Sequence, residues 1–170
     1  MLIVRQENKK DYKEVYEVVK TAFKTAEHAD GNEQDLVESL RKSDAFIPEL
    51  SLVAVEDDKI IGYILFTRIM IGKSEEVALA PLAVLPEHQR QGVGTRLIKA
   101  GHRIAKEKGY HYSVVLGSEK YYPRLGYKEA IEYSIEAPFE VESKNFMVIK
   151  LNDPKEEIKG VVQYAKEFGI

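Results

Sequence analysis

Cysteine is absent from this sequence. Disulfide bonds, metal sites built from thiolates and a cysteine nucleophile are therefore excluded. Long apolar runs are also missing: no stretch has the ~18 consecutive apolar residues of a membrane-spanning helix, and the first residues lack the basic and then apolar order of a secretory signal. We therefore expect a soluble cytoplasmic protein without a membrane partner.

An excess of positive charge is missing as well. Among 170 residues, 25 lysines and arginines stand against 28 aspartates and glutamates, which gives a net charge of -3, and no long basic run occurs. Proteins that bind nucleic acid or anionic membranes through charge usually carry a basic patch, so we do not expect a nucleic-acid partner. A chain of this length can form the core of one domain without covalent cross-links.

The order of the apolar patterns predicts a mixed α/β fold. Apolar residues at helical spacing indicate helices over 12–23, 36–40 and 97–105, and Asn8 and Asp11 precede the first of them at the spacing of a capping box. The remaining runs complete the pattern: strands over 2–4, 50–55, 60–71, 77–85, 112–116 and 145–151, and a short helix over 119–125. This order predicts a mixed sheet covered by helices.

Two segments give a less regular signal. Pro81 lies in the middle of the apolar run 77–85. Because proline cannot donate to a sheet ladder, we expect a bulge or the end of strand pairing there; the alternative is an edge strand that tolerates the proline. In the tail, Asp153 and Pro154 favour the start of a helix, whereas residues 161–164 favour a strand, and both interpretations remain open.

Gly92 and Gly94 lie between the apolar run and the next predicted helix. A strand that enters a helix through glycine leaves main-chain N–H groups unsatisfied at the helix start, where the helix dipole favours anions. Side chains at the two glycines would block a phosphate from the backbone, and Thr95 offers a hydroxyl donor. The alternative is a tight turn without a ligand.

Two well-known phosphate loops do not fit this segment. A dinucleotide fingerprint requires a third glycine where Leu97 stands. A nucleotide-triphosphate loop requires glycine, lysine and then serine or threonine, but the sequence reads Gly94-Thr95-Arg96. The glycines therefore belong to a different kind of loop.

Two motifs together resemble a known superfamily. Gln89-Arg90-Gln91-Gly92-Val93-Gly94, preceded by Leu82-Ala83-Val84-Leu85-Pro86, resembles the acetyl-coenzyme A signature of the GNAT superfamily of N-acetyltransferases. Tyr121-Tyr122-Pro123-Arg124-Leu125-Gly126-Tyr127 resembles its second signature. The sequence is most similar to a bacterial group of predicted N-acetyltransferases with Leu-Ala-Pro-Leu-Ala-Val-Leu-Pro in the fourth strand. The resemblance covers residues 1–151, and we expect 152–170 to be an extension packed on the same domain.

The resemblance implies a mixed central sheet with helices on both faces, acetyl-coenzyme A as cosubstrate and no metal. It implies that the fourth and fifth strands separate and that the pantetheine arm of coenzyme A lies in the gap, while main-chain N–H groups of the glycine loop hold the pyrophosphate. The residues implied in binding are Leu82, Ala83, Val84, Gln89, Arg90, Gln91, Gly92, Val93, Gly94 and Thr95.

Acetyl transfer to an amine needs a neutral nucleophile, support for the developing oxyanion and a proton for the departing thiolate. The resemblance implies a main-chain N–H near Val84 as the oxyanion donor and Tyr122 as the proton donor. A phenol with a pKa of about 10 keeps its proton at neutral pH. Adjacent side chains on a short helix point in different directions, so we expect Tyr121 to pack; the alternative for Tyr122 is also a buried aromatic.

A general base is harder to assign. Some members of the superfamily carry a carboxylate on the fourth strand, but the middle of that strand is Ala78-Leu79-Ala80. Glu33, at the start of the second predicted helix, is a candidate base or substrate contact; the alternatives are a solvated glutamate in the first turn and a base that is water. The histidines lack partners at metal-ligand spacing and are interpreted as surface or structural residues: His28, His88, His102 and His111.

Three functions remain open from the sequence. The first is transfer of an acetyl group to an amine of a small molecule, peptide or protein. The second is a non-catalytic module that binds acyl-coenzyme A, and the third is a nucleotide-binding protein. Acidic residues indicate a cationic acceptor or a solvated helix start: Glu27, Asp30, Glu33 and Asp35. The sequence does not decide between a monomer and a homodimer.

Overall fold

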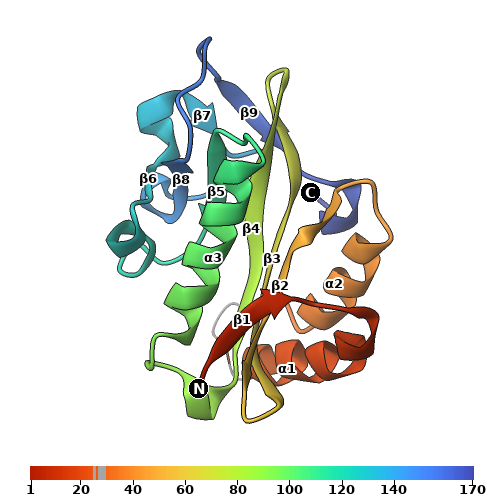
Figure 1. The fold of residues 1–170 in the computed structure, drawn as a ribbon. Helices are drawn as coiled ribbons and strands as arrows, with labels where there is room; N and C mark the ends of the chain where they lie inside the picture. Colours follow the sequence, from red (N-terminus) through yellow and green to blue (C-terminus); the bar gives the residue numbers. More distant parts are fainter. Residues whose placement is uncertain (25, 27–29) are drawn as a thin grey trace.

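The structure is a computed structural model that describes residues 1–24, 26 and 30–170. One twisted mixed sheet runs through the molecule, and its strands follow the order β1-β2-β3-β4-β5-β8-β6, with β9 paired to β3 and β7 (Figure 1). The strands are β1 Ile3–Gln6, β2 Phe46–Glu56, β3 Lys59–Ile71, β4 Ser74–Val84, β5 Tyr112–Leu116, β6 Lys128–Glu129, β7 Ile135–Glu136, β8 Phe146–Lys150 and β9 Gly160–Gln163. Only β4–β5 and β7–β9 are parallel pairs in the part of the chain described.

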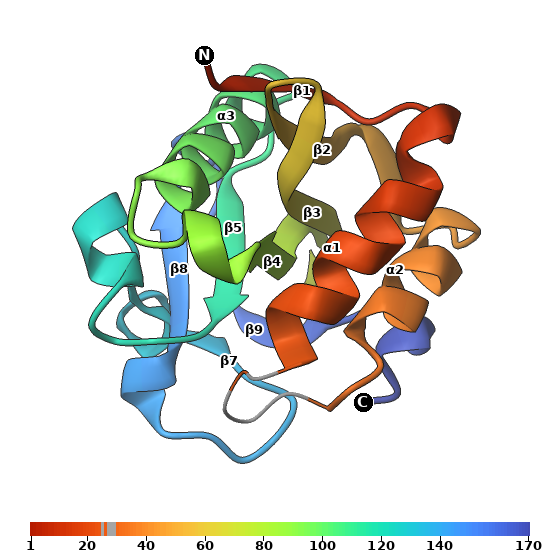
Figure 2. The same cartoon turned by 90° about the horizontal axis from the view of Figure 1, so that it is seen from below.

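Helices cover both faces of the sheet. Helix α3 (Val93–Glu107) lies on one face, and α1 (Tyr12–Lys24) and α2 (Glu33–Arg41) lie together on the other (Figures 1 and 2). Short 3₁₀ turns connect these elements: Lys9–Asp11, Pro86–His88, Tyr122–Leu125, Ala130–Tyr133, Ser143–Asn145 and Lys166–Phe168. The predicted mixed α/β fold is confirmed. No described helix combines the length and the apolar character that a membrane span requires.

Each helix is amphipathic and buries one stripe of apolar residues. In α1 the buried residues are Val15, Val18 and Val19, and the helix packs against β3 and β4. The predicted capping box is present ahead of it: Asp11 Oδ2 accepts a hydrogen bond from Asn8 N at 2.8 Å, and Asn8 Oδ1 accepts one from Lys10 N at 3.0 Å. The two bonds satisfy N–H groups that the start of a helix leaves open.

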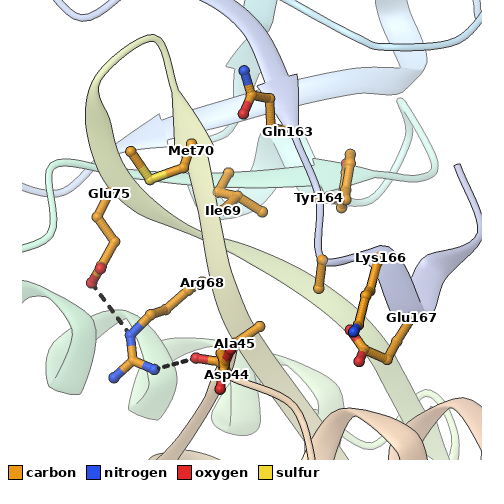
Figure 3. Close-up of a pocket in the computed structure, with 11 residues that line it drawn as sticks. Asp44, Ala45, Arg68, Ile69, Met70, Glu75, Gln163, Tyr164, Lys166 and Glu167 are labelled. Atoms are coloured by element: carbon orange, nitrogen blue, oxygen red, sulfur yellow. Dashed lines mark hydrogen bonds and ion pairs between the residues drawn. The ribbon is translucent and has the colours of Figure 1, made fainter.

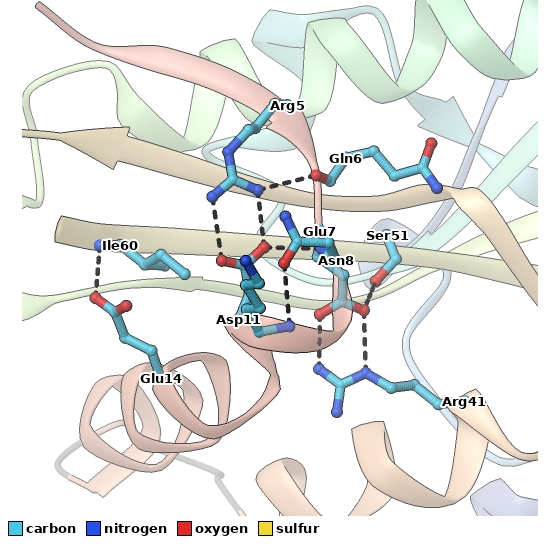
Figure 4. A network of polar contacts seen from close by, with 10 residues as sticks. Arg5, Gln6, Glu7, Asn8, Asp11, Glu14, Arg41, Ser51 and Ile60 are labelled. Carbon is cyan, nitrogen blue, oxygen red and sulfur yellow. Dashed lines mark hydrogen bonds and ion pairs between the residues drawn. The ribbon is translucent and has the colours of Figure 1, made fainter. Parts of the chain in front are cut away.

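A buried polar network ties α2 to the sheet (Figure 4). The Arg41 guanidinium donates to both carboxylate oxygens of Glu7, at 2.7 and 3.0 Å, and both side chains are almost fully buried. Ser51 Oγ also donates to Glu7 and lies 2.7 Å from the hydroxyl of Tyr63. Strands β1 and β2 and the end of α2 are thereby fixed relative to one another. The guanidinium also lies over the ring of Tyr12, 3.9 Å from its centroid.

The tail forms a strand, which answers the question that the sequence left open. Gln163 pairs with Met70 and Val162 with Ile71. Strand β9 therefore lies beside the end of β3, past the last residue of β3 that pairs with β2. The expected helix over 119–125 is shorter than predicted, a 3₁₀ turn that ends at Gly126 with φ of 101°. Strands β6 and β7 were not predicted, because each is two residues long and has no periodic pattern.

Candidate active site

Strands β4 and β5 pair over a short distance and then part. Parallel pairing runs from Val77 with Ser113 to Leu79 with Val115 and goes no further in the described structure. On the other side of β4, Ile64 pairs with Leu82 and Phe66 with Leu79, so β4 holds one more residue than β3 between these pairs. The extra residue forms a bulge at Ala80 and Pro81. The predicted bulge at the proline is therefore confirmed, and it coincides with the end of pairing to β5.

The backbone of β4 presents polar groups to the gap that this separation leaves. Leu85 N donates to Ile61 O at 2.9 Å, so the main-chain polar groups of Leu85 point toward β3. Because the direction alternates along a strand, Ala83 also turns its N–H and C=O toward β3, whereas Leu82 and Val84 turn theirs toward the gap. The side chains of Leu82 and Val84 are half-buried, and that of Ala83 is buried.

The loop after β4 contains the two glycines. Gly92 precedes α3 with φ of 83°, in the left-handed region, and no atom lies within 4 Å of the position where a Cβ would stand. Its requirement for glycine is therefore conformational. At Gly94, a Cβ would lie 3.0 Å from the hydroxyl of Tyr121, so that glycine provides room between α3 and the tyrosine. The expectation that both glycines keep a side chain away from a bound phosphate stays a prediction.

The start of α3 has a backbone geometry that favours an anion. The helix begins with Arg96 N donating to Gly92 O at 3.1 Å, and no side chain caps the helix at Gly92. The N–H groups of the first turn have no acceptor within a helix, and the dipole places partial positive charge there. A phosphate group fits these properties.

One open cavity of about 560 Å³ joins the gap to this loop. The predicted binding residues that line it are Leu82, Val84, Gln89, Arg90, Gly92, Val93, Gly94 and Thr95. Ala83 and Gln91 do not line it, and Gln91 Nε2 instead donates to Glu87 O at 3.3 Å. Sequence reasoning assigned no ligand contact to His88, Tyr121 or Arg124, which complete the lining. The gap and the helix start thus belong to one site.

The tyrosine pair lies beside this cavity with its two members in different environments. Tyr121 lines the cavity, and its hydroxyl lies 3.4 Å from Thr95 Oγ1. Tyr122 is only 9% exposed, and its ring packs edge-on against Tyr121 and Tyr127 at centroid distances of 5.1 and 5.6 Å. Tyr122 is therefore the more deeply packed of the two, whereas we expected Tyr121 to be the member that packs. Burial raises the pKa of Tyr122 above its ordinary value, so the phenol keeps its proton.

Glu33 is placed away from the loop cavity. Its carboxylate accepts hydrogen bonds from Asp30 N at 2.8 Å and from Gly31 N at 3.1 Å, which closes the turn ahead of α2. It lines a different cavity, together with Lys20 and Lys24. Of the other residues named from the sequence, Glu27 and His28 lie outside the described residues.

Glu76 is a carboxylate on β4 that sequence reasoning did not assign. It is fully buried and accepts four hydrogen bonds: from Ser74 Oγ at 2.6 Å, His111 N at 2.7 Å, Tyr112 N at 3.0 Å and the His111 ring at 3.0 Å. These bonds join β4 to the start of β5, at the end of the pair opposite the gap. All its strong acceptor positions are occupied, so its role here is to hold the two strands together.

A second cavity, of about 430 Å³, lies where β2 leaves β3 and β9 joins it (Figure 3). Arg68 points into it, donates to Asp44 O at 2.8 Å and lies 3.4 Å from a carboxylate oxygen of Glu75. The guanidinium is thus already paired within the protein. The described residues contain no group of three or more side chains that could hold a metal ion.

Comparison with known proteins agrees with this geometry. Residues 12–127 match the model of the Acetyltransferase (GNAT) family. The chain is 40% identical over 125 residues to the uncharacterized N-acetyltransferase YjhQ of Escherichia coli K12, a match that covers 71% of this chain and 66% of that protein. It is 32% identical over 140 residues to the uncharacterized N-acetyltransferase YhbS of Escherichia coli K12, covering 80% of this chain and 83% of that one.

Two crystal structures with a bound ligand resemble the whole chain. The GNAT family N-acetyltransferase YhbS from Escherichia coli in complex with CoA has a TM-score of 0.89 and 26% identity, and the match covers 99% of this chain and 92% of that one. A GNAT family acetyltransferase from Brucella melitensis in complex with acetyl-CoA has a TM-score of 0.82 and 29% identity, covering 99% and 98%. The resemblance inferred from the two signatures is confirmed, and the chain belongs to the GNAT family of acetyltransferases, enzymes that depend on acetyl-coenzyme A.

Proposed function

We propose that the protein transfers the acetyl group of acetyl-coenzyme A directly to a primary amine of a small molecule or a protein. The observation that carries this proposal is the single cavity that joins the gap beside β4 to the start of α3. A long ligand with amide groups at one end and a pyrophosphate in its middle matches that combination. The ligands of the two similar crystal structures, CoA and acetyl-CoA, support the same cosubstrate.

The proposed binding mode uses main-chain groups for most contacts. The pyrophosphate accepts hydrogen bonds from the N–H groups of Gln91 to Thr95, and the amides of the pantetheine arm pair with Leu82 and Val84. Arg90 and Arg124 line the same cavity and add positive charge. Ala83 contributes through its place in the strand, since its own polar groups face β3.

The proposed chemistry is a direct displacement at the thioester. The amine nitrogen attacks the carbonyl carbon, a main-chain N–H near Val84 supports the oxyanion, and the carbon–sulfur bond breaks with its electron pair on sulfur. Tyr122 donates its hydroxyl proton to that sulfur and regains a proton from solvent. The attacking nitrogen loses its proton to water or to a carboxylate.

Glu33 as the base stays a prediction. Its two hydrogen bonds to the backbone of Asp30 and Gly31 support a role in shaping the acceptor side of the site, in place of proton removal. A glutamine at position 33 removes the base and also one of the two acceptors, because Asp30 N and Gly31 N donate to different carboxylate oxygens, so the pH dependence of the loss has to separate the two roles. Loss of turnover that a more alkaline buffer restores would favour the base.

Thiol release from acetyl-coenzyme A tests the proposed function. We would measure it over a panel of polyamines, amino acids, aminoglycosides and peptides, with a Tyr122→Phe variant as the matched control. Release that depends on one class of amine and falls in the variant is expected. Binding of coenzyme A without release for any amine would instead favour the non-catalytic acyl-coenzyme A module, and preference for ATP in a thermal-shift competition would favour a nucleotide-binding protein.

A further inference from the structure

A buried chain of hydroxyl and imidazole groups lies directly behind Tyr122. The hydroxyl of Tyr127 is 2.9 Å from Ser113 Oγ on β5 and 2.9 Å from His102 Nε2 on α3. Tyr127 is 2% exposed, and Ser113 is fully buried. One phenol therefore links the helix that follows the glycine loop to the strand that borders the gap.

The protons of this chain have one consistent arrangement. Burial lowers the pKa of His102 to about 4, so its ring is neutral at neutral pH, and burial raises the pKa of Tyr127, which stays protonated. If the Tyr127 hydroxyl donates to His102 Nε2, the Ser113 hydroxyl donates to Tyr127, and both hydroxyl protons have an acceptor. In the opposite direction the Ser113 proton has no side-chain acceptor among the described residues. The tautomer of His102 with its proton on Nδ1 is therefore favoured.

Tyr122 packs against one end of this chain. Its ring meets Tyr127 edge-on, at 76° and 5.6 Å between centroids. On another side it rests on Gly117, where a Cβ would come within 2.4 Å of its ring. Within the described part of the chain no hydrogen bond holds its hydroxyl, so packing alone determines where that hydroxyl points. The hydroxyl of Tyr127 is held by two contacts of 2.9 Å, to His102 and Ser113, whereas that of Tyr121, the other aromatic partner, has one contact of 3.4 Å, to Thr95.

We propose that Tyr127, held by His102 and Ser113, is a positioning residue that aims the hydroxyl of Tyr122 at the departing sulfur. The inference rests on the proposed function, in which Tyr122 donates the proton. It assigns to the Tyr127 hydroxyl an effect on catalysis without any contact with the cosubstrate. The same hydroxyl joins β5 to α3. It therefore fixes the position of Tyr122 relative to the gap, which β5 borders, and to the loop, which α3 follows.

Tyr127→Phe tests the proposal because it removes the hydroxyl and keeps the ring. We expect kcat to fall about tenfold while the KM for acetyl-coenzyme A changes less than about twofold, since a small misplacement of a reacting group affects the chemical step and not binding. The variant leaves the buried Ser113 hydroxyl and the half-buried His102 ring without this partner and should melt at a lower temperature.

Two further variants separate positioning from stability. Adding Ser113→Ala to Tyr127→Phe removes an orphaned hydroxyl and should raise the melting temperature again, but kcat should stay low because the ring at position 127 remains unanchored. His102→Gln keeps an acceptor for the Tyr127 hydroxyl and should retain most of the turnover, whereas His102→Leu leaves that hydroxyl with Ser113 alone and should lower kcat, though less than Tyr127→Phe. A kcat that follows the melting temperature through this series would overturn the proposal.

A double-variant cycle and a crystal structure complete the test. In a Tyr122→Phe background, Tyr127→Phe should have no further effect on kcat, and independent effects would overturn the proposal. Crystals of wild type and Tyr127→Phe with coenzyme A should differ in the orientation of the Tyr122 ring, and an unchanged ring would overturn it even if no acceptor is found. Failure of the proposed function is a different result: wild type would release no thiol, or Tyr122→Phe would retain full turnover.

Discussion

The side-chain amide of Gln89 donates to the carbonyl oxygen of Val84 at 3.1 Å. This bond closes the turn between the end of β4 and the glycine loop, and it uses a carbonyl that points away from β3. It therefore fixes the loop against the end of β4, between the part of the cavity that lies in the gap and the part that lies at the start of α3. Position 89 is the first residue of the signature that led from the sequence to the family.

We expect Gln89→Ala to raise the KM for acetyl-coenzyme A about fivefold with little change in kcat, because a hydrogen bond of this kind contributes about 1 kcal/mol to the geometry of the loop. Steady-state kinetics at saturating amine would measure it. Gln91→Ala is the matched control, since Gln91 Nε2 donates to Glu87 O outside the cavity. Equal effects of the two variants would contradict the assigned role of Gln89.

Substitutions at Gly92 and at Gly94 should weaken coenzyme A binding for different reasons. Gly92→Val forces a branched side chain into a left-handed conformation, and we expect it to weaken coenzyme A binding severely, by about tenfold or more, because such strain costs about 1–3 kcal/mol. Arg90→Ala should give a milder loss, since its side chain only supplements the main-chain contacts. Isothermal titration with coenzyme A would measure both. Normal affinity in a folded Gly92→Val protein would contradict the phosphate-loop assignment.

Gly94→Ala should weaken coenzyme A binding through its contact with Tyr121, whose hydroxyl would lie 3.0 Å from the new Cβ. Adding Tyr121→Phe removes that hydroxyl and should restore affinity. The same titration decides the point, and no recovery in the double variant would mean that the alanine acts on the loop itself.

Tyr122→Phe should lower turnover by about 100-fold, within the usual range for the loss of a general acid, with coenzyme A affinity and melting temperature nearly unchanged. Tyr121→Phe should keep turnover close to wild type, because its hydroxyl faces Thr95 and the loop. The rates should be compared in a single turnover, so that slow product release does not hide the chemical step. Similar rates in the two variants would favour a packing role for Tyr122.

His102 should make the protein less stable in mild acid. Its pKa is lowered by burial from 6.5 to about 4, so between these values the unfolded chain takes up a proton that the folded protein refuses. Stability therefore falls as the pH drops from 6.5 to 4, by about 3 kcal/mol in total, and the loss is complete below pH 4. Urea unfolding of wild type and His102→Gln across this range would measure it. The difference between the two proteins should change with pH, and parallel curves would contradict the buried neutral imidazole.

Arg41→Met should lower the free energy of unfolding by about 3 kcal/mol, because it leaves the buried carboxylate of Glu7 without its cation. Arg5→Met is the control: Arg5 pairs with Asp11 at 2.7 Å but is 40% exposed, and its loss should cost no more than about 1 kcal/mol. Denaturant titration of both variants would show the difference, and comparable losses would mean that burial does not determine the strength of these pairs.

The sequence predicted those parts of the site whose cause is local. Pro81 cannot continue a ladder, and the bulge and the end of β4–β5 pairing lie there. The cap at Asn8 and Asp11 likewise depends on residues a few positions apart. The left-handed φ of Gly92 was not predicted. The resemblance to the family added the combination of these features into one cavity, which no single pattern contains.

What the sequence did not predict depends on contacts between distant residues. The partners of the Tyr127 hydroxyl are 14 and 25 residues away along the chain, on a strand and a helix. The different environments of Tyr121 and Tyr122 depend on Gly117 and on the course of α3. Helical periodicity gives no information about such pairs, because they exist only after the sheet and helices have packed.

The separation of β4 from β5 has a consequence for how this enzyme reads its cosubstrate. Along its first half β4 bonds to a protein strand on each side, and along its second half, at Leu82 and Val84, one side is open. In the proposed complex a non-protein chain with amide groups takes the place of the missing strand. The main chain of β4 then recognises the pantetheine amides by the regular spacing of N–H and C=O groups that every β-strand has. The side chains of Leu82 and Val84 can therefore vary as long as they fit the gap. Changes of these side chains that suit a different amine acceptor would leave the binding of coenzyme A intact.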